Sequence, residues 1–199
     1  MKAFLLALLC APLFAASNDL TAYFIDVEGG QATLFVTPAG ESVLIDTGWA
    51  GFNGRDADRI VKVASEAGVK QIDYLLITHF HMDHVGGVPA LAAKMPIKNF
   101  VDHGVTIEHD KDGQKLYDAY DAVRAKGHHI IVKAGDKLPI KGLDWTIISA
   151  GGKDIDKPLP GASGKPNPDC AAFKKRDIAD DENGPVSYTH LTLPTNREV

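Results

Sequence analysis

The chain has 199 residues, of which 45% are hydrophobic and 24% are charged, so it can bury a core and need not be disordered, and one globular domain is expected. The formal net charge is -5 and there are no basic runs. The sequence therefore gives no sign of the basic surface that a stable complex with nucleic acid needs. Transient contact with nucleic acid is compatible with this charge, because bound metal ions would reverse the field locally.

The first residues predict an export signal. Lys2 supplies a positive end, and residues 3–14 form an apolar run that is too short to span a bilayer. We therefore expect residues 1–17 to be a signal peptide and the mature protein to be periplasmic or secreted, with no membrane contact after the signal is removed. A buried N-terminal helix is the alternative. Removal of the signal would leave Cys170 as the only cysteine, and no partner for it is evident.

The chain then begins with β-structure. Residues 21–27 are rich in β-forming side chains and run into the turn 28–31, whose two glycines permit a tight reversal. Residues 32–37 and 41–46 predict a hairpin around a Pro-Ala-Gly turn. This arrangement leaves Asp46 at the C-terminal end of a strand.

Helices and strands alternate after this hairpin. Apolar residues at helical spacing from Asp56 predict a helix that ends at Gly68, and the apolar run 73–78 predicts a strand covered on both faces. Further along, we expect a helix over 88–93, a strand at 99–101 and an amphipathic helix that ends at Gly127. Two more strands are expected at 129–132 and 145–149, joined through residues 133–140. Residues 151–167 lack periodicity and predict a long surface loop.

A group of metal-ligating residue types follows the buried strand directly, namely His79, His81, Asp83 and His84. Three imidazoles with a carboxylate among them can present two ligand sets. Such nitrogen and oxygen donors suit zinc, with manganese or iron as alternatives. A histidine-rich surface loop is the other interpretation, but this spacing between a buried strand and a Gly-Gly helix start is rarely coincidental.

This stretch resembles the His-x-His-x-Asp-His signature of the metallo-β-lactamase superfamily, and the Val-Gly-Gly that follows fits its continuation. The resemblance implies an α/β fold, the N-terminal half of an αββα sandwich in which two mixed sheets are covered by helices. It also implies two divalent metal ions at the sheet edge, the first bound by His79 and His81 and the second by Asp83 and His84. A hydroxide that bridges the metals would then be the nucleophile of a hydrolase.

Asp46, within Leu-Ile-Asp-Thr-Gly, matches the first motif of the same family, an acidic residue at a strand end. The resemblance implies that Asp46 orients the ligand loop and, with Asp83, contributes to catalysis. An aspartate that caps a turn or a helix is the ordinary interpretation of this residue type. His103, past the strand at 99–101, is either a turn histidine or a residue that faces the site. The histidines at positions 109, 128 and 129 are expected to be solvated.

A narrower resemblance is carried by residues 26–32, Asp-Val-Glu-Gly-Gly-Gln-Ala. They are similar to the opening turn of the metallo-β-lactamase domain of ComEC-type DNA-uptake proteins, which has Gly and Asp where this chain has Glu28 and Gln31. That resemblance implies a phosphodiester substrate, in a small molecule or in nucleic acid. The alternatives are a lactonase or β-lactamase that cleaves an ester or amide, and a non-catalytic metal-binding module. Nothing in the sequence indicates an oligomeric state.

The end of the chain is unlike the rest. Residues 186–195 are similar to the conceptual translation of a transposase adapter used in sequencing-library preparation. We therefore expect residues 18–184 to be the N-terminal part of a metallo-β-lactamase-fold domain and residues 185–199 to be adapter read-through that packs poorly. The later metal ligands would then be missing, and the chain as written would bind metal weakly and be inactive. A natural edge strand is the other interpretation.

Overall fold

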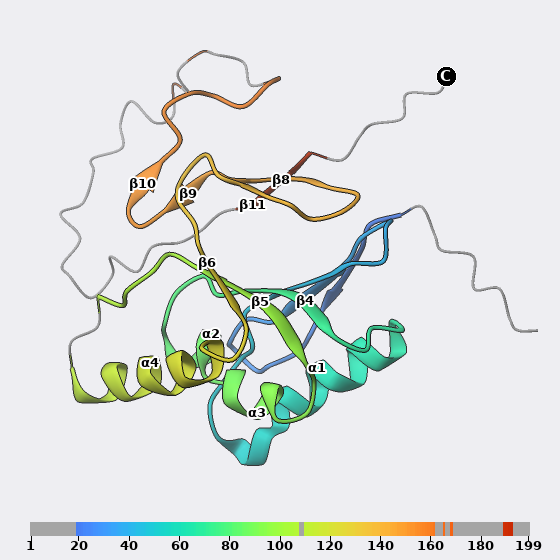
Figure 1. Cartoon of the computed structure of the whole chain (residues 1–199), viewed down its shortest axis with the longest axis vertical. Coiled ribbons are helices and arrows are strands. Elements are labelled where there is room, and N and C mark those ends of the chain that lie inside the picture. The colour runs from blue at the N-terminus through green and yellow to red at the C-terminus, as the bar shows by residue number, and fades with distance from the viewer. Residues whose placement is uncertain (1–18, 108–109, 162–164, 166–167, 169–188, 193–199) are drawn as a thin grey trace, which may run out of the picture.

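The structure, a computed structural model, describes residues 19–107, 110–161, 165, 168 and 189–192, the last of these as backbone only. The expected signal peptide and Cys170 lie outside the described residues. A six-stranded sheet forms the centre of the molecule, in the order β1-β2-β3-β4-β5-β6 (Figure 1). Its strands are β1 Thr21–Phe24, β2 Thr33–Val36, β3 Ser42–Ile45, β4 Ile72–Leu76, β5 Ile97–Asp102 and β6 His128–Ile131.

The central sheet is mixed. β1, β2 and β3 pair antiparallel, with Leu34 opposite Leu44, which confirms the predicted hairpin. β3, β4, β5 and β6 pair parallel, with Leu44 opposite Leu75. Because neighbouring parallel strands end at the same edge of a sheet, the residues that follow β3, β4 and β5 are brought together there.

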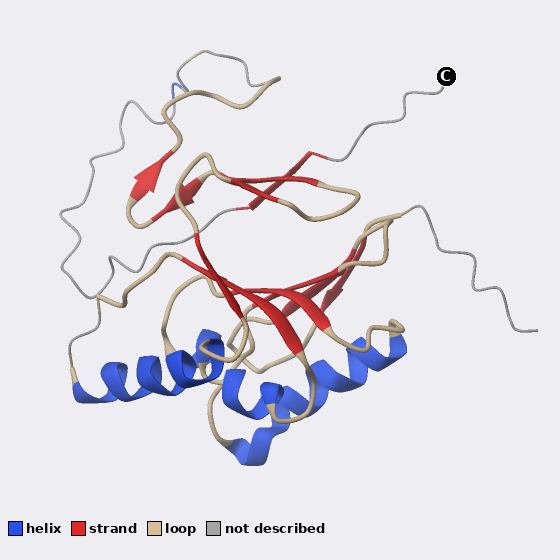
Figure 2. Cartoon of the chain, viewed as in Figure 1, coloured by secondary structure: helices blue, strands red, loops and turns tan. Residues whose placement is uncertain are grey.

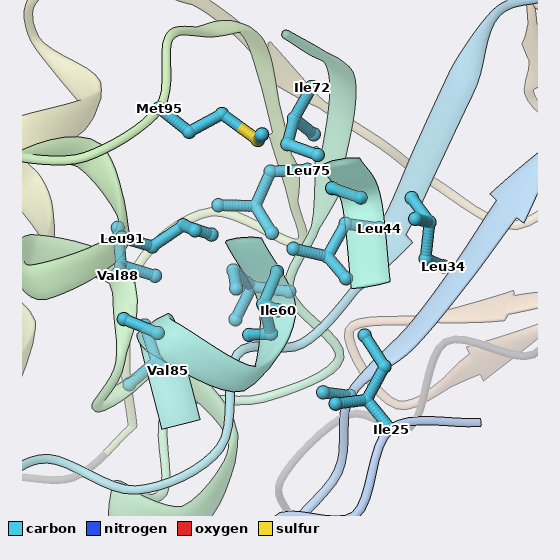
Figure 3. Close-up of a cluster of buried hydrophobic side chains, with 14 of the residues drawn as sticks. Ile25, Leu34, Leu44, Ile60, Ile72, Leu75, Val85, Val88, Leu91 and Met95 are labelled. Carbon is cyan, nitrogen blue, oxygen red and sulfur yellow. The ribbon is translucent and has the colours of Figure 1, made fainter. Parts of the chain in front are cut away.

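Helices cover one face of this sheet (Figure 2). They are the short 3₁₀ helix η1 Phe52–Gly54 and the α-helices α1 Arg55–Glu66, α2 Met82–Val85, α3 Val88–Ala92 and α4 Lys111–Arg124. The core on this side joins side chains of the strands to those of the helices, among them Leu44, Ile60, Leu75 and Leu91, none of which is exposed (Figure 3). Burial of each such side chain contributes roughly 1.5–3 kcal/mol.

A second, smaller sheet lies against the other face, in the order β11-β8-β7. Its strands are β7 Lys137–Leu138, β8 Asp144–Ile147 and β11 Thr189–Thr192. The second core places Trp145 and Ile147 of β8 against Val43, Tyr74 and other side chains of the central sheet. The expected layering, a helix-covered mixed sheet with a second sheet behind it, is confirmed. The second sheet differs from the expectation in one respect, since it is antiparallel throughout in the described residues.

Two connections contain more structure than expected. Within residues 133–140 the short strand β7 pairs with β8. The segment 151–167 does not begin as a loop, because β9 Ser149–Ala150 and β10 Lys153–Asp154 form a small hairpin. Gly151 and Gly152, with φ of 59° and 70°, make its tight turn, which is a backbone geometry that other residues rarely adopt.

The C-terminal segment is described only at residues 189–192. Their backbone pairs antiparallel with β8 at the edge of the second sheet. Their side chains lie outside what the structure describes, so the expectation that residues 186–199 pack poorly stays a prediction. The adapter interpretation, which concerns the origin of the sequence, stays a prediction. Within the described residues, no helix is both long enough and apolar enough to cross a membrane.

Candidate metal centre

Three parallel strands deliver the candidate site residues to one edge of the central sheet. β3 is followed by Asp46, β4 by Thr78 and the histidine loop, and β5 by His103. The loop itself contains the one-turn helix α2, which the sequence did not predict. The structure thus brings Asp46 and the four loop residues together at the edge where the sequence places them.

Asp46 connects two strand ends to the histidine loop. Its side chain is fully buried, and its φ of 57° lies in the left-handed region, a strained geometry that is often found at functional sites. One carboxylate oxygen accepts a hydrogen bond from the backbone N–H of Thr78 at 2.8 Å. The other oxygen accepts one from the Thr78 hydroxyl at 2.6 Å and lies 2.8 Å from Nδ1 of His84. Asp46 therefore fixes the orientation of the His84 ring through Nδ1 and leaves Nε2 on the side of Asp83.

The histidine rings lie in contact with one another. The ring centroid of His79 is 4.6 Å from that of His81 and 3.9 Å from that of His84. Nε2 of His84 is 3.6 Å from a carboxylate oxygen of Asp83. Nδ1 of His79 lies 3.1 Å from the Thr78 hydroxyl. Four potential ligands of the two kinds that zinc prefers are thus collected within one short loop.

Burial and mutual proximity change the protonation of this cluster. Burial, reinforced by the neighbouring His84 and His81, lowers the pKa of His79 to about 4. The ring is therefore neutral at neutral pH, which is the form that binds a metal ion. Burial also opposes protonation of His84, but the hydrogen bond and charge of Asp46 outweigh it and raise its pKa.

Close backbone packing holds the loop against the turn after β3. The carbonyl of His84 accepts hydrogen bonds from both the backbone N–H and the hydroxyl of Thr47, at 2.7 and 2.9 Å. A Cβ on Gly87 would lie 2.1 Å from the carbonyl oxygen of Thr47, and one on Gly86 would lie 2.3 Å from the backbone nitrogen of Ala50. The two glycines after the motif are therefore required by the contact between the two turns.

The turn between β1 and β2 also packs on the loop. The N–H of Gln31 donates to the carbonyl of Asp83 at 3.1 Å, and a Cβ on Gly30 would lie 2.4 Å from the same oxygen. Glu28, at a φ of 55°, forms ion pairs with Arg55 and Arg59 of α1 at 2.7 and 2.8 Å. This turn thus supports the histidine loop, although the loop motif alone gives no sign of it.

The donor set suits a divalent cation, but only in part. Neutral imidazole and carboxylate are the ligands of zinc, manganese and iron sites. Among the described residues, however, no group of three or more His, Cys, Asp or Glu side chains is placed to hold one metal ion. A further observation favours a bound cation: Asp46 is fully buried, yet in the described part of the chain no lysine or arginine pairs with it. A buried carboxylate needs a compensating positive charge, which a protonated His84 or a metal ion would supply.

One buried polar cluster at this edge was not predicted. Asp102, the last residue of β5, is buried and accepts hydrogen bonds from Tyr120 at 2.6 Å and Arg124 at 3.1 Å, and lies 2.9 Å from Nε2 of His129. The expectation that His129 is solvated holds only in part, because its ring closes this cluster while its side chain stays 26% exposed. His128 is exposed as expected, and His109 lies outside the described residues. The only sign of this cluster in the sequence was the place of Asp102 directly after the strand predicted at 99–101. Its partner Arg124 is distant in the sequence and gave no local signal.

His103 packs beside the loop and not within it. Its ring lies 4.7 Å from that of Phe80, which stands between His79 and His81 in the sequence. Burial is the largest cause that lowers its pKa, partly offset by Asp102. Its Nε2 is buried and has no hydrogen-bond partner among the described residues.

The sequence profile of the Metallo-beta-lactamase superfamily matches residues 25–190, and the chain belongs to this superfamily. Three relatives illustrate its range. Lactamase-like protein aptB of Emericella nidulans is 37% identical over 94 residues, which are 43% of this chain and 29% of that protein. Ribonuclease Z of Bradyrhizobium diazoefficiens is 32% identical over 75 residues, 38% of this chain and 23% of that enzyme. ComE operon protein 3 of Bacillus subtilis is 32% identical over 91 residues, 45% of this chain and 11% of that protein.

The chain therefore spans less than a third of the length of each of these relatives. The predicted superfamily is confirmed. The narrower ComEC-type resemblance has a counterpart in ComE operon protein 3, which is one partial match among several of different kinds.

Proposed function

We propose that this protein is a metal-dependent hydrolase that cleaves a phosphodiester at the edge formed by β3, β4 and β5. The observation that carries the proposal is the 2.8 Å contact between the buried Asp46 and Nδ1 of His84, which orients a ligand loop in the manner of a metalloenzyme. In this proposal His79 and His81 hold one divalent ion, Asp83 and His84 hold a second, and zinc is the favoured metal.

Divalent ions bound there would lower the pKa of coordinated water and polarise a phosphoryl oxygen. The protein side chains have separate tasks. Asp46 keeps His84 in the tautomer and orientation that leave Nε2 available, and its buried charge strengthens that nitrogen as a ligand. The low pKa of His79, caused by burial and by its histidine neighbours, keeps its ring neutral and ready to bind.

The choice of substrate has two sources of support. Among the relatives are a protein named ribonuclease Z and a protein named for the ComE operon, and the first acts on a phosphodiester by its name. The lactamase-like relative keeps hydrolysis of an ester or amide as the second candidate. A non-catalytic metal-binding module is the third, and it would retain the loop without turnover.

A panel of three substrates tests the proposal. We also propose that the chain as written binds metal weakly and is inactive, so the test uses a form that continues past residue 184 and carries the later metal ligands. This form is loaded with zinc or manganese and given bis(4-nitrophenyl) phosphate, a lactone and a chromogenic cephalosporin. We expect turnover of the phosphodiester, abolished by a chelator and by the double variant His81→Ala/His84→Ala. The variant Lys126→Ala, at an exposed residue remote from the loop, is the matched control. Preferred turnover of the lactone or cephalosporin would overturn the substrate assignment, and bound metal without any turnover would indicate a binding module.

Two further proposals accompany this function. We propose that the protein is exported and acts in the periplasm or outside the cell, on the pattern of its first 17 residues. We also propose that the substrate is engaged without a standing complex with nucleic acid, as the net charge of -5 suggests. Fractionation of the native host and mass spectrometry of the mature N-terminus test the first of these.

A further inference from the structure

The hydroxyl of Thr78 is the point where three residues of the site meet. Thr78 lies between the end of β4 and the first histidine of the loop. Its Oγ1 is 2.6 Å from a carboxylate oxygen of Asp46, 3.1 Å from Nδ1 of His79 and 3.3 Å from Nδ1 of His84. The predicted ligand set does not include Thr78, so its part in the site has to come from these contacts.

The number of available protons decides the direction of each hydrogen bond. A hydroxyl has a single proton to donate, and an ionised carboxylate can only accept. The 2.6 Å distance between the Thr78 hydroxyl and Asp46 is in the range of a charge-assisted O–H···O⁻ bond. The proton of Thr78 therefore points at Asp46, since two oxygens at this distance without a proton between them would repel each other. The lone pairs of the same hydroxyl are left to accept.

The second contact of the hydroxyl sets the tautomer of His79. Because its proton is donated to Asp46, Thr78 can bind Nδ1 of His79 only as an acceptor, so Nδ1 carries the proton. The 3.1 Å distance suits an N–H···O bond. A neutral imidazole has one such proton, so Nε2 holds a free lone pair, which is what a metal ion needs. In water the neutral ring favours the opposite tautomer, and the hydroxyl therefore works against the ring's own preference.

His84 does not depend on the hydroxyl in the same way. Its Nδ1 is 2.8 Å from Asp46, closer than the 3.3 Å to Thr78, and the carboxylate is the stronger acceptor. Asp46 therefore holds His84 directly and reaches His79 through Thr78. The backbone N–H of Thr78 also donates to Asp46, at 2.8 Å, so the strand end keeps this contact when only the hydroxyl is removed.

We propose that Thr78 is a positioning residue of the metal centre, whose hydroxyl holds His79 in the tautomer that presents an unprotonated Nε2 to the first metal ion. The inference rests on the proposed function for the role of His79 as a ligand. It extends the influence of Asp46 from the second metal ion to the first. One buried carboxylate thus prepares a ligand of each ion, His84 by direct contact and His79 through Thr78.

NMR of the metal-free full chain tests the tautomer directly. Long-range ¹H–¹⁵N correlation spectra distinguish a protonated ring nitrogen from an unprotonated one, at a pH where His79 is neutral. We expect the proton of His79 on Nδ1 in the wild type and in Thr78→Ser, which keeps the hydroxyl. In Thr78→Val, which keeps only the shape, this proton should move to Nε2, whereas His84 should keep its Nδ1 proton. A role of Thr78 in packing alone would not produce this selective change.

Two results of this experiment would overturn the assignment. One is a wild-type His79 that carries its proton on Nε2, a result that needs no variant and is obtained even if Thr78→Val fails to fold. The other is a folded Thr78→Val protein that keeps the wild-type tautomer. Thr21→Val is the matched control and should change neither histidine, because Thr21 lies opposite Val36 at the end of the central sheet remote from Asp46.

Zinc affinity connects the tautomer to the metal. In the form that continues past residue 184, Thr78→Val should weaken zinc binding about tenfold, because an orienting contact to a ligand is lost, and Thr78→Ser should bind almost as the wild type does. If the wild type cleaves no phosphodiester while tautomer and affinity change as expected, the proposed function fails and the role of Thr78 stands. If it cleaves phosphodiesters while Thr78→Val binds zinc as tightly as the wild type, the role of Thr78 is wrong and the proposed function stands. A wild type that binds no zinc would remove both.

Discussion

Two buried aspartates stand at the ends of neighbouring parallel strands, Asp46 after β3 and Asp102 at the end of β5. They share an edge of the sheet, and both carboxylates are almost completely removed from solvent. Their partners differ. Arg124 neutralises Asp102 at 3.1 Å, whereas the groups around Asp46 are the Thr78 N–H and hydroxyl and the ring of His84.

The difference shows how the same residue type serves structure in one place and chemistry in another. Asp102 ties helix α4 to the sheet through Tyr120 and Arg124, and its charge is balanced within the fold. In the part of the chain that the structure describes, no lysine or arginine balances the charge of Asp46, so a protonated His84 or a bound cation would have to do so. A buried carboxylate without a permanent cation is costly to fold. Such a residue is therefore a better indicator of a functional site than burial or hydrogen bonding alone.

The largest effect is expected from removal of the balanced carboxylate. Asp102→Ala leaves Arg124, whose side chain is only 12% exposed, without its buried partner. Loss of one member of a buried ion pair costs about 3–5 kcal/mol, and we expect the free energy of unfolding in urea to fall by that amount. The double variant Asp102→Ala/Arg124→Met is the control and should recover part of the loss. A decrease below about 1 kcal/mol would show that the cluster is not a structural tie.

The variant Asp46→Asn should show most clearly that Asp46 serves metal binding, whereas Asp102 serves folding stability. The amide keeps the size of the side chain and its contact with the Thr78 N–H, so we expect the metal-free protein to stay folded. Loss of the charge behind His84 should weaken zinc binding about 10–100-fold, which a competitive titration with a chromophoric chelator measures. Asp58→Asn, at an exposed residue of α1, is the matched control. Unchanged zinc affinity would remove the orienting role of Asp46.

Each of the two aspartates is followed two residues later by a glycine, Gly48 and Gly104, whose replacement should change the free energy of unfolding by a smaller amount. Gly104 has a φ of 108°, and a Cβ there would meet only a Ile131 methyl at 3.6 Å. Gly104→Ala should therefore cost about 1–2 kcal/mol from backbone strain alone. Gly48→Ala should cost more in the same urea experiment, because its Cβ would also lie 2.6 Å from a carboxylate oxygen of Asp56. Equal costs would mean that the turn after β3 relaxes easily.

Much of this arrangement follows from local sequence patterns. The hairpin β2–β3, the buried strand β4 and the helix α1 were predictable, because period-two and helical patterns with terminal glycines report directly on local backbone geometry. Asp46 was identified by its position at a strand end, and the four loop residues by the close spacing of histidine and aspartate side chains after a buried strand.

The unpredicted features depend on contacts between distant residues. The cluster of Asp102, Arg124 and His129 joins a strand, a helix and a second strand, and none of these residues carries a local signal. The hairpin β9–β10 was hidden in a segment whose Gly and Lys content is typical of a loop. A cavity of about 600 Å³, lined by His103, Lys133 and Lys153 among others, forms only where the end of β5, the segment after β6 and that hairpin meet.

The smallest expected effect is a pH dependence that arises at the histidine loop. Burial and the neighbouring His84 and His81 lower the pKa of His79 from 6.5 to about 4 in the folded protein. Between these two values the unfolded chain binds a proton that the folded chain does not, so the contribution of His79 to the free energy of unfolding decreases as the pH falls from 6.5 towards 4. His84 acts in the opposite direction, because its raised pKa favours the folded state at low pH. Urea unfolding of the metal-free wild type and of His79→Gln across this range isolates the contribution of His79. We expect the wild type to lose stability relative to the variant on acidification, and parallel curves would show that the ring of His79 is not shielded from protonation in the folded protein.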